Sequence, residues 1–121
     1  MNMKKFAAAL LIILCFASMA AAFGKKGVIP EGDPISYRGL RVSENGVSLT
    51  LVNKGDKAVT FNAALVFLSD KRKELGDTYI EKTTIEPGGE AVFKDLFLKG
   101  DYKVCRKAAT LAWTIYLLEA K

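Results

Sequence analysis

The fold class of this chain is decided by one stretch of sequence, Val59-Thr60-Phe61-Asn62-Ala63-Ala64-Leu65-Val66-Phe67-Leu68. Its odd-numbered residues are all apolar, whereas its even-numbered residues change from polar to apolar along the stretch. Alternation with a period of two is typical of a β-strand that turns one face to a core. We therefore expect a strand at 59–68 that is half-exposed at its start and buried on both faces at its end.

The segments on either side of this stretch repeat the pattern. Strands are expected at 35–42 (with Gly39 as a bulge), 47–51, 75–85, 91–98 and 102–105. Turn signals rich in Gly, Pro and Asn separate them, at 44–46, 53–57 and 86–90. This spacing of short strands and turns predicts an all-β antiparallel β-sandwich of about seven strands, with a small Greek-key barrel as the alternative.

The segment 109–118 fits two patterns. Its odd-numbered residues from Leu111 to Leu117 alternate with the rest, as in a strand. Four apolar residues also fit one face of a helix: Ala108, Leu111, Ala112 and Ile115. The content of Thr, Trp, Ile and Tyr favours the strand, and Trp113 is then expected in the core.

Residues 1–22 have the layout of a cleavable secretory signal peptide. Lys4 and Lys5 come before an apolar run at 6–16, and a stretch of small residues follows at 17–22. The segment therefore predicts export, and the working protein is expected in the periplasm or outside the cell. No membrane association is expected once the signal is cleaved.

The N-terminal segment leaves three alternatives open. Cleavage after Ala22 is favoured, but cleavage after Ala20 also satisfies the small-x-small rule. An uncleaved membrane anchor at 6–23 would approach the length that spans a bilayer. A lipid on Cys15 is disfavoured because Leu14, a large residue, stands before it.

The rest of the chain reads as one domain. Residues 23–34 are rich in Gly and Pro and are expected to be a linker. The sandwich domain is then expected at 35–121, with no internal repeat and no second domain.

The charge of the chain is mild and scattered. Without Lys4 and Lys5, the 18 basic residues become 16 against 13 acidic ones, a net charge of +3. The densest basic cluster, 71–73, stands between Asp70 and Glu74, as in a solvated turn. Nucleic-acid binders concentrate basic residues on one face, so no nucleic-acid partner is expected.

The chain has no histidine, which removes a large part of catalytic and metal chemistry. No cofactor, metal-ligating residue or catalytic residue is predicted. Cys105 is the only cysteine after the signal segment, so no disulfide can form within the mature chain. A buried, structural thiol is favoured over a functional or intermolecular one.

Two groups of acids are the only candidates for catalysis. Asp70, Glu74 and Asp77 lie near one predicted turn, and Glu86 and Glu90 flank another. Paired carboxylates can hydrolyse substrates when a cleft holds them at a suitable separation. Acids in turns between strands are more often solvated, and we expect the protein not to be an enzyme.

The stretch from Leu51 to Phe93 carries a recognisable set of elements. A strand ends in Val52-Asn53-Lys54-Gly55, an apolar strand closes in Leu65–Asp70, and Pro87–Glu90 forms a turn before an aromatic strand. In these elements the chain resembles the FxLYD-like group of small bacterial secreted domains. The resemblance implies an immunoglobulin-like fold and a place in the cell envelope, and it implies no catalytic residues.

These observations favour a non-catalytic binding or assembly module of the bacterial envelope. Its partner is expected to be another envelope protein, bound through an edge strand. The polar segment 75–85 is the candidate edge, although Glu81 and Lys82 are charges of the kind that protect edges. The alternatives are a membrane-tethered accessory domain, held by an uncleaved helix at 6–23, and a small carboxylate-based hydrolase.

Overall fold

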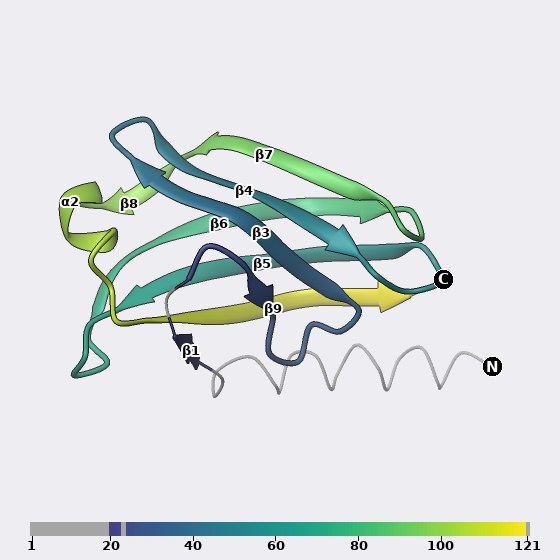
Figure 1. Ribbon diagram of the computed structural model, residues 1–121, viewed down its shortest axis with the longest axis horizontal. Helices are drawn as coiled ribbons and strands as arrows, with labels where there is room; N and C mark the ends of the chain where they lie inside the picture. The colour runs from purple at the N-terminus through teal and green to yellow at the C-terminus, as the bar shows by residue number, and fades with distance from the viewer. Residues whose placement is uncertain (1–19, 23, 121) are drawn as a thin grey trace.

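The computed structural model describes residues 24–120 and the backbone of residues 20–22 (Figure 1). The large sheet has the strand order β1-β9-β5-β6-β8 and contains β1 (Ala20–Ala22), β5 (Val59–Leu68), β6 (Glu74–Ile85), β8 (Leu98–Gly100) and β9 (Thr110–Ala120). The small sheet has the order β2-β3-β4-β7 and contains β2 (Gly27–Val28), β3 (Ile35–Ser43), β4 (Gly46–Asn53) and β7 (Glu90–Leu96). All the strand pairs are antiparallel.

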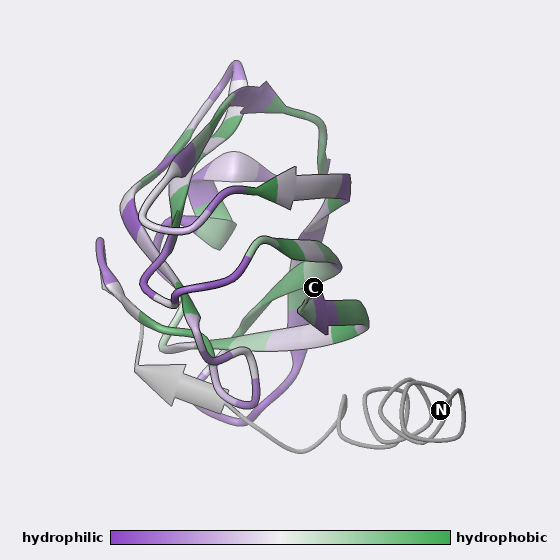
Figure 2. Ribbon diagram, turned by 90° about the vertical axis from the view of Figure 1, so that its right-hand side faces the viewer, coloured by the Kyte–Doolittle hydropathy of each residue, from purple (hydrophilic) through white to green (hydrophobic). Residues whose placement is uncertain are grey.

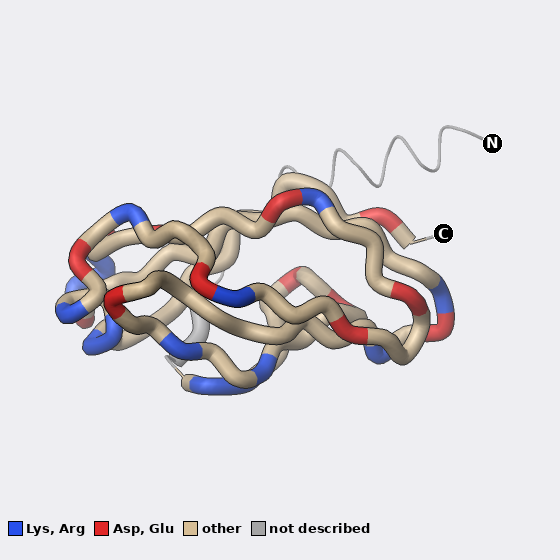
Figure 3. The backbone as a smooth tube through the Cα atoms, turned by 90° about the horizontal axis from the view of Figure 1, so that it is seen from above, with Lys and Arg blue, Asp and Glu red and all other residues tan. Residues whose placement is uncertain are grey.

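The two sheets form two layers (Figure 2), and buried apolar residues from both sheets make up one core. The prediction of an all-β fold with antiparallel sheets is therefore confirmed. Basic and acidic residues are interspersed along the backbone (Figure 3).

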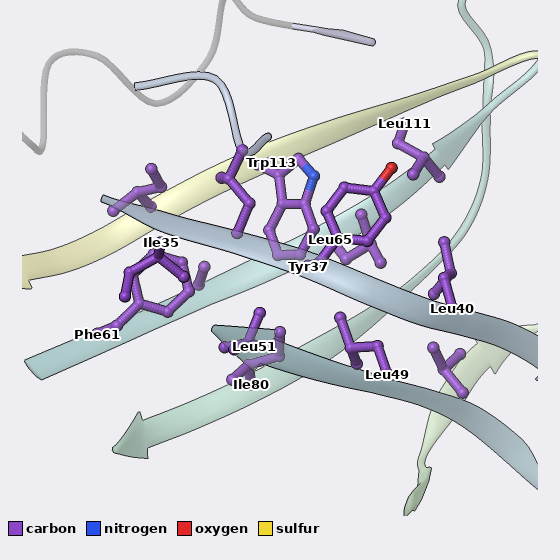
Figure 4. Packing of buried hydrophobic residues seen from close by; sticks show 14 of the residues in the cluster. Ile35, Tyr37, Leu40, Leu49, Leu51, Phe61, Leu65, Ile80, Leu111 and Trp113 are labelled. Atoms are coloured by element: carbon purple, nitrogen blue, oxygen red, sulfur yellow. The ribbon is translucent and has the colours of Figure 1, made fainter. Parts of the chain in front are cut away.

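The core lies between β5 and the facing strands of the small sheet. Alternate residues of β5 are fully buried: Val59, Phe61, Ala63, Leu65 and Phe67. Across the interface, the ring of Tyr37 from β3 packs on Trp113 from β9, with ring centroids 5.6 Å apart (Figure 4). Burial of one large apolar side chain stabilises the fold by about 1.5–3 kcal/mol. Residues that alternate along the strands with the predicted period of two supply most of the core.

The predicted turns and the Gly39 bulge are confirmed. The register of β3 against β4 shifts between Arg38 and Arg41, and Gly39 there has φ 65°. In the turn after β6, the amide of Gly89 donates to the carbonyl of Glu86 at 2.8 Å and Gly88 has φ 72°. A positive φ at this corner suits glycine because it has no Cβ to clash.

The segment 109–118 belongs to a strand, β9, which resolves the ambiguity in favour of the strand. Trp113 is buried as predicted, and β9 pairs with β5 along its whole length. The neighbouring strand β5, whose alternate residues are buried, favours the extended form of the segment 109–118. In this form the segment makes backbone hydrogen bonds to β5 and also packs Trp113 in the core.

The expected strand at 102–105 is wrong, since these residues form the helical turn α2 (Tyr102–Cys105). Asp101 caps the turn, because its side chain accepts a hydrogen bond of 2.8 Å from the Lys103 amide. The expected strand at 91–98 is also divided, with β7 ending at Leu96 in the small sheet and β8 beginning at Leu98 in the large sheet. The chain therefore crosses between the sheets at Phe97.

The segment expected to be a linker packs on the sandwich. Within 23–34, Gly27–Val28 forms β2 against β3, and Ile29 is buried in the core. Residues 1–19 of the predicted signal peptide lie outside the described residues. Its last residues, Ala20–Ala22, pair with β9 as β1. Among the described residues, no helix is long and apolar enough to span a bilayer.

Candidate functional site

A groove opens on the side of the sandwich where β6 and β8 of the large sheet face β7 of the small sheet. It has a volume of about 620 Å³. Its lining residues are Asp77, Thr78, Tyr79, Glu81, Phe93, Leu96, Phe97 and Lys99. We call it the edge groove, because it runs between the margins of the two sheets.

Phe97 is the most exposed large apolar side chain of the groove, with 81% of its surface accessible. Its backbone is nevertheless fixed, because the buried hydroxyl of Thr78 donates to the Phe97 carbonyl at 2.7 Å. Asp95, two residues earlier, has φ 55° and helps the chain to turn out of β7. Phe97 thus places an exposed aromatic ring beside a hydrogen-bonded backbone carbonyl.

The backbone of β6 borders the groove with an incomplete set of strand partners. Strand β8 pairs with β6 only at Gly76, Asp77 and Thr78. From Tyr79 to Ile85, no strand of the described part of the chain pairs with β6 on that side. The segment 75–85 is therefore an edge over its second half, whereas the prediction of an edge is wrong at 76–78, where β8 covers it.

Acidic residues outnumber basic ones in the lining of the edge groove. Asp77 and Glu81 line it, and Lys99 is the one basic residue among its lining residues. Glu74 lies beside Asp77, and a hydrogen bond between the two carboxyl groups raises the pKa of Glu74 above its ordinary value. Burial and the charge of Asp77 raise this pKa further, and the charge of Lys99 lowers it. With two carboxylates against one ammonium group, the lining of the edge groove carries net negative charge.

The structure brings together only some of the acids considered for catalysis. Glu74 and Asp77 lie close enough to influence each other, as the raised pKa of Glu74 indicates. Glu90 instead binds Arg38 from β3, on the outer face of the small sheet. Glu86 lies in the turn before β7, and Asp70 lies in the turn before β6, where both are exposed. None of these three acids lines the edge groove.

Cys105 is a buried free thiol, as predicted. Burial raises its pKa, and the nearby carboxylates of Asp101 and Asp77 raise it further. A thiol with a raised pKa is a poor nucleophile. Within residues 20–22 and 24–120, no three His, Cys, Asp or Glu side chains group in a way that could hold a metal ion.

Phe97 is not among the residues that the sequence analysis singles out. A signal was present, because Leu96-Phe97-Leu98 breaks the period of two and three apolar neighbours cannot share one face of a strand. The crossing of the chain from one sheet to the other turns the middle residue outward.

Comparison of the chain with protein-family models, with curated proteins and with solved structures finds no match.

Proposed function

We propose that this protein is a non-catalytic binding and assembly module of the bacterial cell envelope. It takes up an extended segment of another envelope protein in the edge groove. Export by a signal peptide at 1–22 and an immunoglobulin-like form of the sandwich are parts of the proposal. The observation that carries it is the open edge of β6 from Tyr79 to Ile85, beside the exposed ring of Phe97.

Backbone pairing supplies the first part of the binding energy. Unpaired N–H and C=O groups at the margin of a sheet can accept a further strand. Strand β8 already pairs with β6 at 76–78, so an incoming segment would continue its line along β6. The partner needs no fold of its own for this contact, only an extended backbone.

Side chains of the edge groove set the chemistry of the partner. Phe97, Tyr79 and Phe93 offer apolar surface, and the carboxylates of Asp77 and Glu81 offer negative charge. An extended segment that carries apolar and basic residues in alternation satisfies both. The charges of Glu81 and Lys82 discourage indiscriminate pairing, and so they restrict which segments bind.

The proposal is tested by retention of partners from envelope extract on the tagged protein. Phe97→Ser removes the exposed ring, and Val28→Ser is the matched control, because Val28 is 73% exposed but lies on β2, outside the groove. We expect the wild type and Val28→Ser to retain the same envelope protein, and Phe97→Ser to retain about tenfold less. Retention of no protein, or equal retention by both variants, would refute the proposal.

A further inference from the structure

Strand β7 forms a long margin at one end of the small sheet (Figure 1). It pairs with β4 on one side, and no strand within residues 20–22 and 24–120 pairs with it on the other. The other strands at the ends of the two sheets, β1, β2 and β8, have only two or three residues, whereas β7 has 7. Short end strands leave few backbone groups open, so β7 is the end strand that offers the most of them.

The regular part of this margin covers residues 90–94 and is centred on Val92. The register of β7 against β4 shifts between Phe93 and Leu96. Asp95, which lies at this shift, has φ 55° and so leaves the extended conformation. A second strand that paired with the open side of β7 would therefore be limited to the stretch 90–94.

The backbone groups of alternate residues in this stretch face the open side. The amide of Asn53 donates to the carbonyl of Gly89 at 3.0 Å, and backbone groups alternate in direction along a strand. The N–H and C=O groups of Glu90, Val92 and Lys94 therefore point away from β4. The side chains of the same three residues are exposed on the outer face of the small sheet, and 72% of the surface of Val92 is accessible.

The sequence of this stretch, Glu90-Ala91-Val92-Phe93-Lys94, is complementary to itself. When two copies of β7 pair antiparallel about a two-fold axis at Val92, Glu90 of each copy lies opposite Lys94 of the other. The two Val92 side chains then meet at the centre of the outer face. On the inner face, the small Ala91 lies opposite the large Phe93. Each cross-strand pair thus joins opposite charges or two apolar side chains.

The charges also select this register over its neighbours. Pairing about Glu90 or about Lys94 would place two like charges directly opposite each other, which destabilises a pair of strands. Pairing about Ala91 or about Phe93 would place the exposed Val92 opposite a charged residue. The pairing about Val92 is therefore the two-fold register within 90–94 that matches charge with charge and apolar with apolar.

We propose that this protein forms a dimer with a second copy of itself through β7. The two small sheets, of four strands each, then join into one continuous sheet. Glu90, which Arg38 of its own copy already binds on the outer face, gains Lys94 of the second copy as a further partner. Interfaces of this closed two-fold kind are the commonest in homo-oligomers.

The dimer is expected to be weak, because its contact consists of one short pair of strands. Contacts at the low end of interface size are typical of transient complexes, and we expect a Kd of about 100 µM. The second copy contacts the margin of β7, whereas the extended segment of the proposed function pairs with β6. The inference therefore goes beyond the proposed function and does not depend on it.

Sedimentation equilibrium of the purified chain between about 10 µM and 1 mM tests whether the dimer forms. We expect a mass close to that of the monomer at the low end of this range, and a mass that approaches twice this value at the high end. The mass of the monomer at every concentration would overturn the proposal.

Two charge reversals identify the surface of the dimer. Glu90→Lys and Lys94→Glu each place like charges opposite each other, and the two-fold axis repeats the repulsion. Each variant alone is expected to dimerise at least about tenfold more weakly than the wild type. In an equimolar mixture, one variant carries two positive charges at positions 90 and 94 and the other carries two negative charges. Dimerisation in the mixture is therefore expected to return to within about threefold of the wild type.

Two further variants complete the test. Lys71→Glu makes the same change of charge in the exposed turn between β5 and β6, and it should leave dimerisation unchanged. Val92→Lys places two like charges at the two-fold axis, and it should weaken dimerisation at least about tenfold without altering the contact between Glu90 and Arg38. A dimer that no substitution in β7 weakens, or a mixture that dimerises no better than either charge reversal alone, would overturn the assignment to β7.

Discussion

The side chain of Asn53, at the end of β4, donates a hydrogen bond of 2.9 Å to the carbonyl of Ile85, at the end of β6, and so joins the two sheets. The same amide donates to the Lys57 carbonyl at 2.8 Å and accepts from the Gly55 amide at 2.9 Å. The side chain is completely buried. Asn53, which the sequence pattern places in a turn, thus connects the two sheets through its side-chain hydrogen bond.

Replacement of Asn53 by alanine is therefore expected to destabilise the fold by about 3 kcal/mol, because it leaves buried backbone groups without partners. Chemical denaturation, followed by the fluorescence of the buried Trp113, measures the free energy of unfolding. Asn45→Ala, in the exposed turn before β4, is the control and should change this energy by no more than about 0.5 kcal/mol. Equal effects of the two substitutions would contradict the role of Asn53.

The pair of Glu74 and Asp77 predicts a pH dependence of stability. The pKa of Glu74 is raised in the folded protein from its ordinary value of 4.5, so the folded state holds the proton more tightly than the unfolded state. The protonated Glu74 side chain therefore contributes to stability at pH values below the ordinary pKa of the unfolded state. This contribution is lost as the pH rises through the raised pKa of the folded state. The effect is small because Glu74 is exposed and solvent screens its charge.

The Glu74→Gln variant measures this contribution. It should be more stable than the wild type near neutral pH, where the two carboxylates repel each other, and the difference should disappear towards pH 4 or so. Thermal unfolding midpoints at a series of pH values provide the comparison. A difference that stays constant over the series would show that the two groups do not interact.

Cys105 is expected to be unreactive in the folded protein, since its thiol is buried and its pKa is raised. In a Cys15→Ser background, which leaves Cys105 as the only thiol, a disulfide reagent should modify the native protein at least about a hundredfold more slowly than the unfolded protein. Rapid modification of the native state would mean that α2 does not stay packed on β6 and β8.

Gly76 should not tolerate alanine. A Cβ there would lie 2.6 Å from the Sγ atom of Cys105 and 2.6 Å from the carbonyl oxygen of Lys99. The collision with backbone would separate β8 from β6, at an expected cost of about 2 kcal/mol in the free energy of unfolding. Gly24→Ala is the control, since a Cβ there would meet its nearest neighbour, the Lys26 carbonyl oxygen, at 3.7 Å. Similar stability of both variants would argue against close packing at Gly76.

Residues with strong local patterns were predictable from the sequence, and residues fixed by distant contacts were not. The period of two at 59–68 predicts the central strand of the core, because burial of alternate residues is a local pattern. The turn at 102–105 was not predictable, since Cys105 packs between Gly76 and Gly100, which only the folded chain brings together. Packing of this kind overrides a weak propensity for strand.

The edge groove could be predicted only in part for the same reason. The polar composition of 75–85 suggests an edge. The length of β8, however, decides where the edge opens, and the crossing of the chain at Phe97 decides which apolar side chain stands beside it.

The central claim is that the edge groove binds an extended segment of another envelope protein. Site-specific photocrosslinking in cells that produce this protein tests it most directly. A photoreactive phenylalanine analogue replaces Phe97, which is 81% exposed in the edge groove, or Val28, which is 73% exposed outside it. We expect position 97 to crosslink to an extended segment with apolar and basic residues in another envelope protein, and position 28 to give no crosslink to it. Crosslinks of equal yield at both positions, or none at position 97, would contradict the account of this protein as a module that binds extended segments through its edge groove.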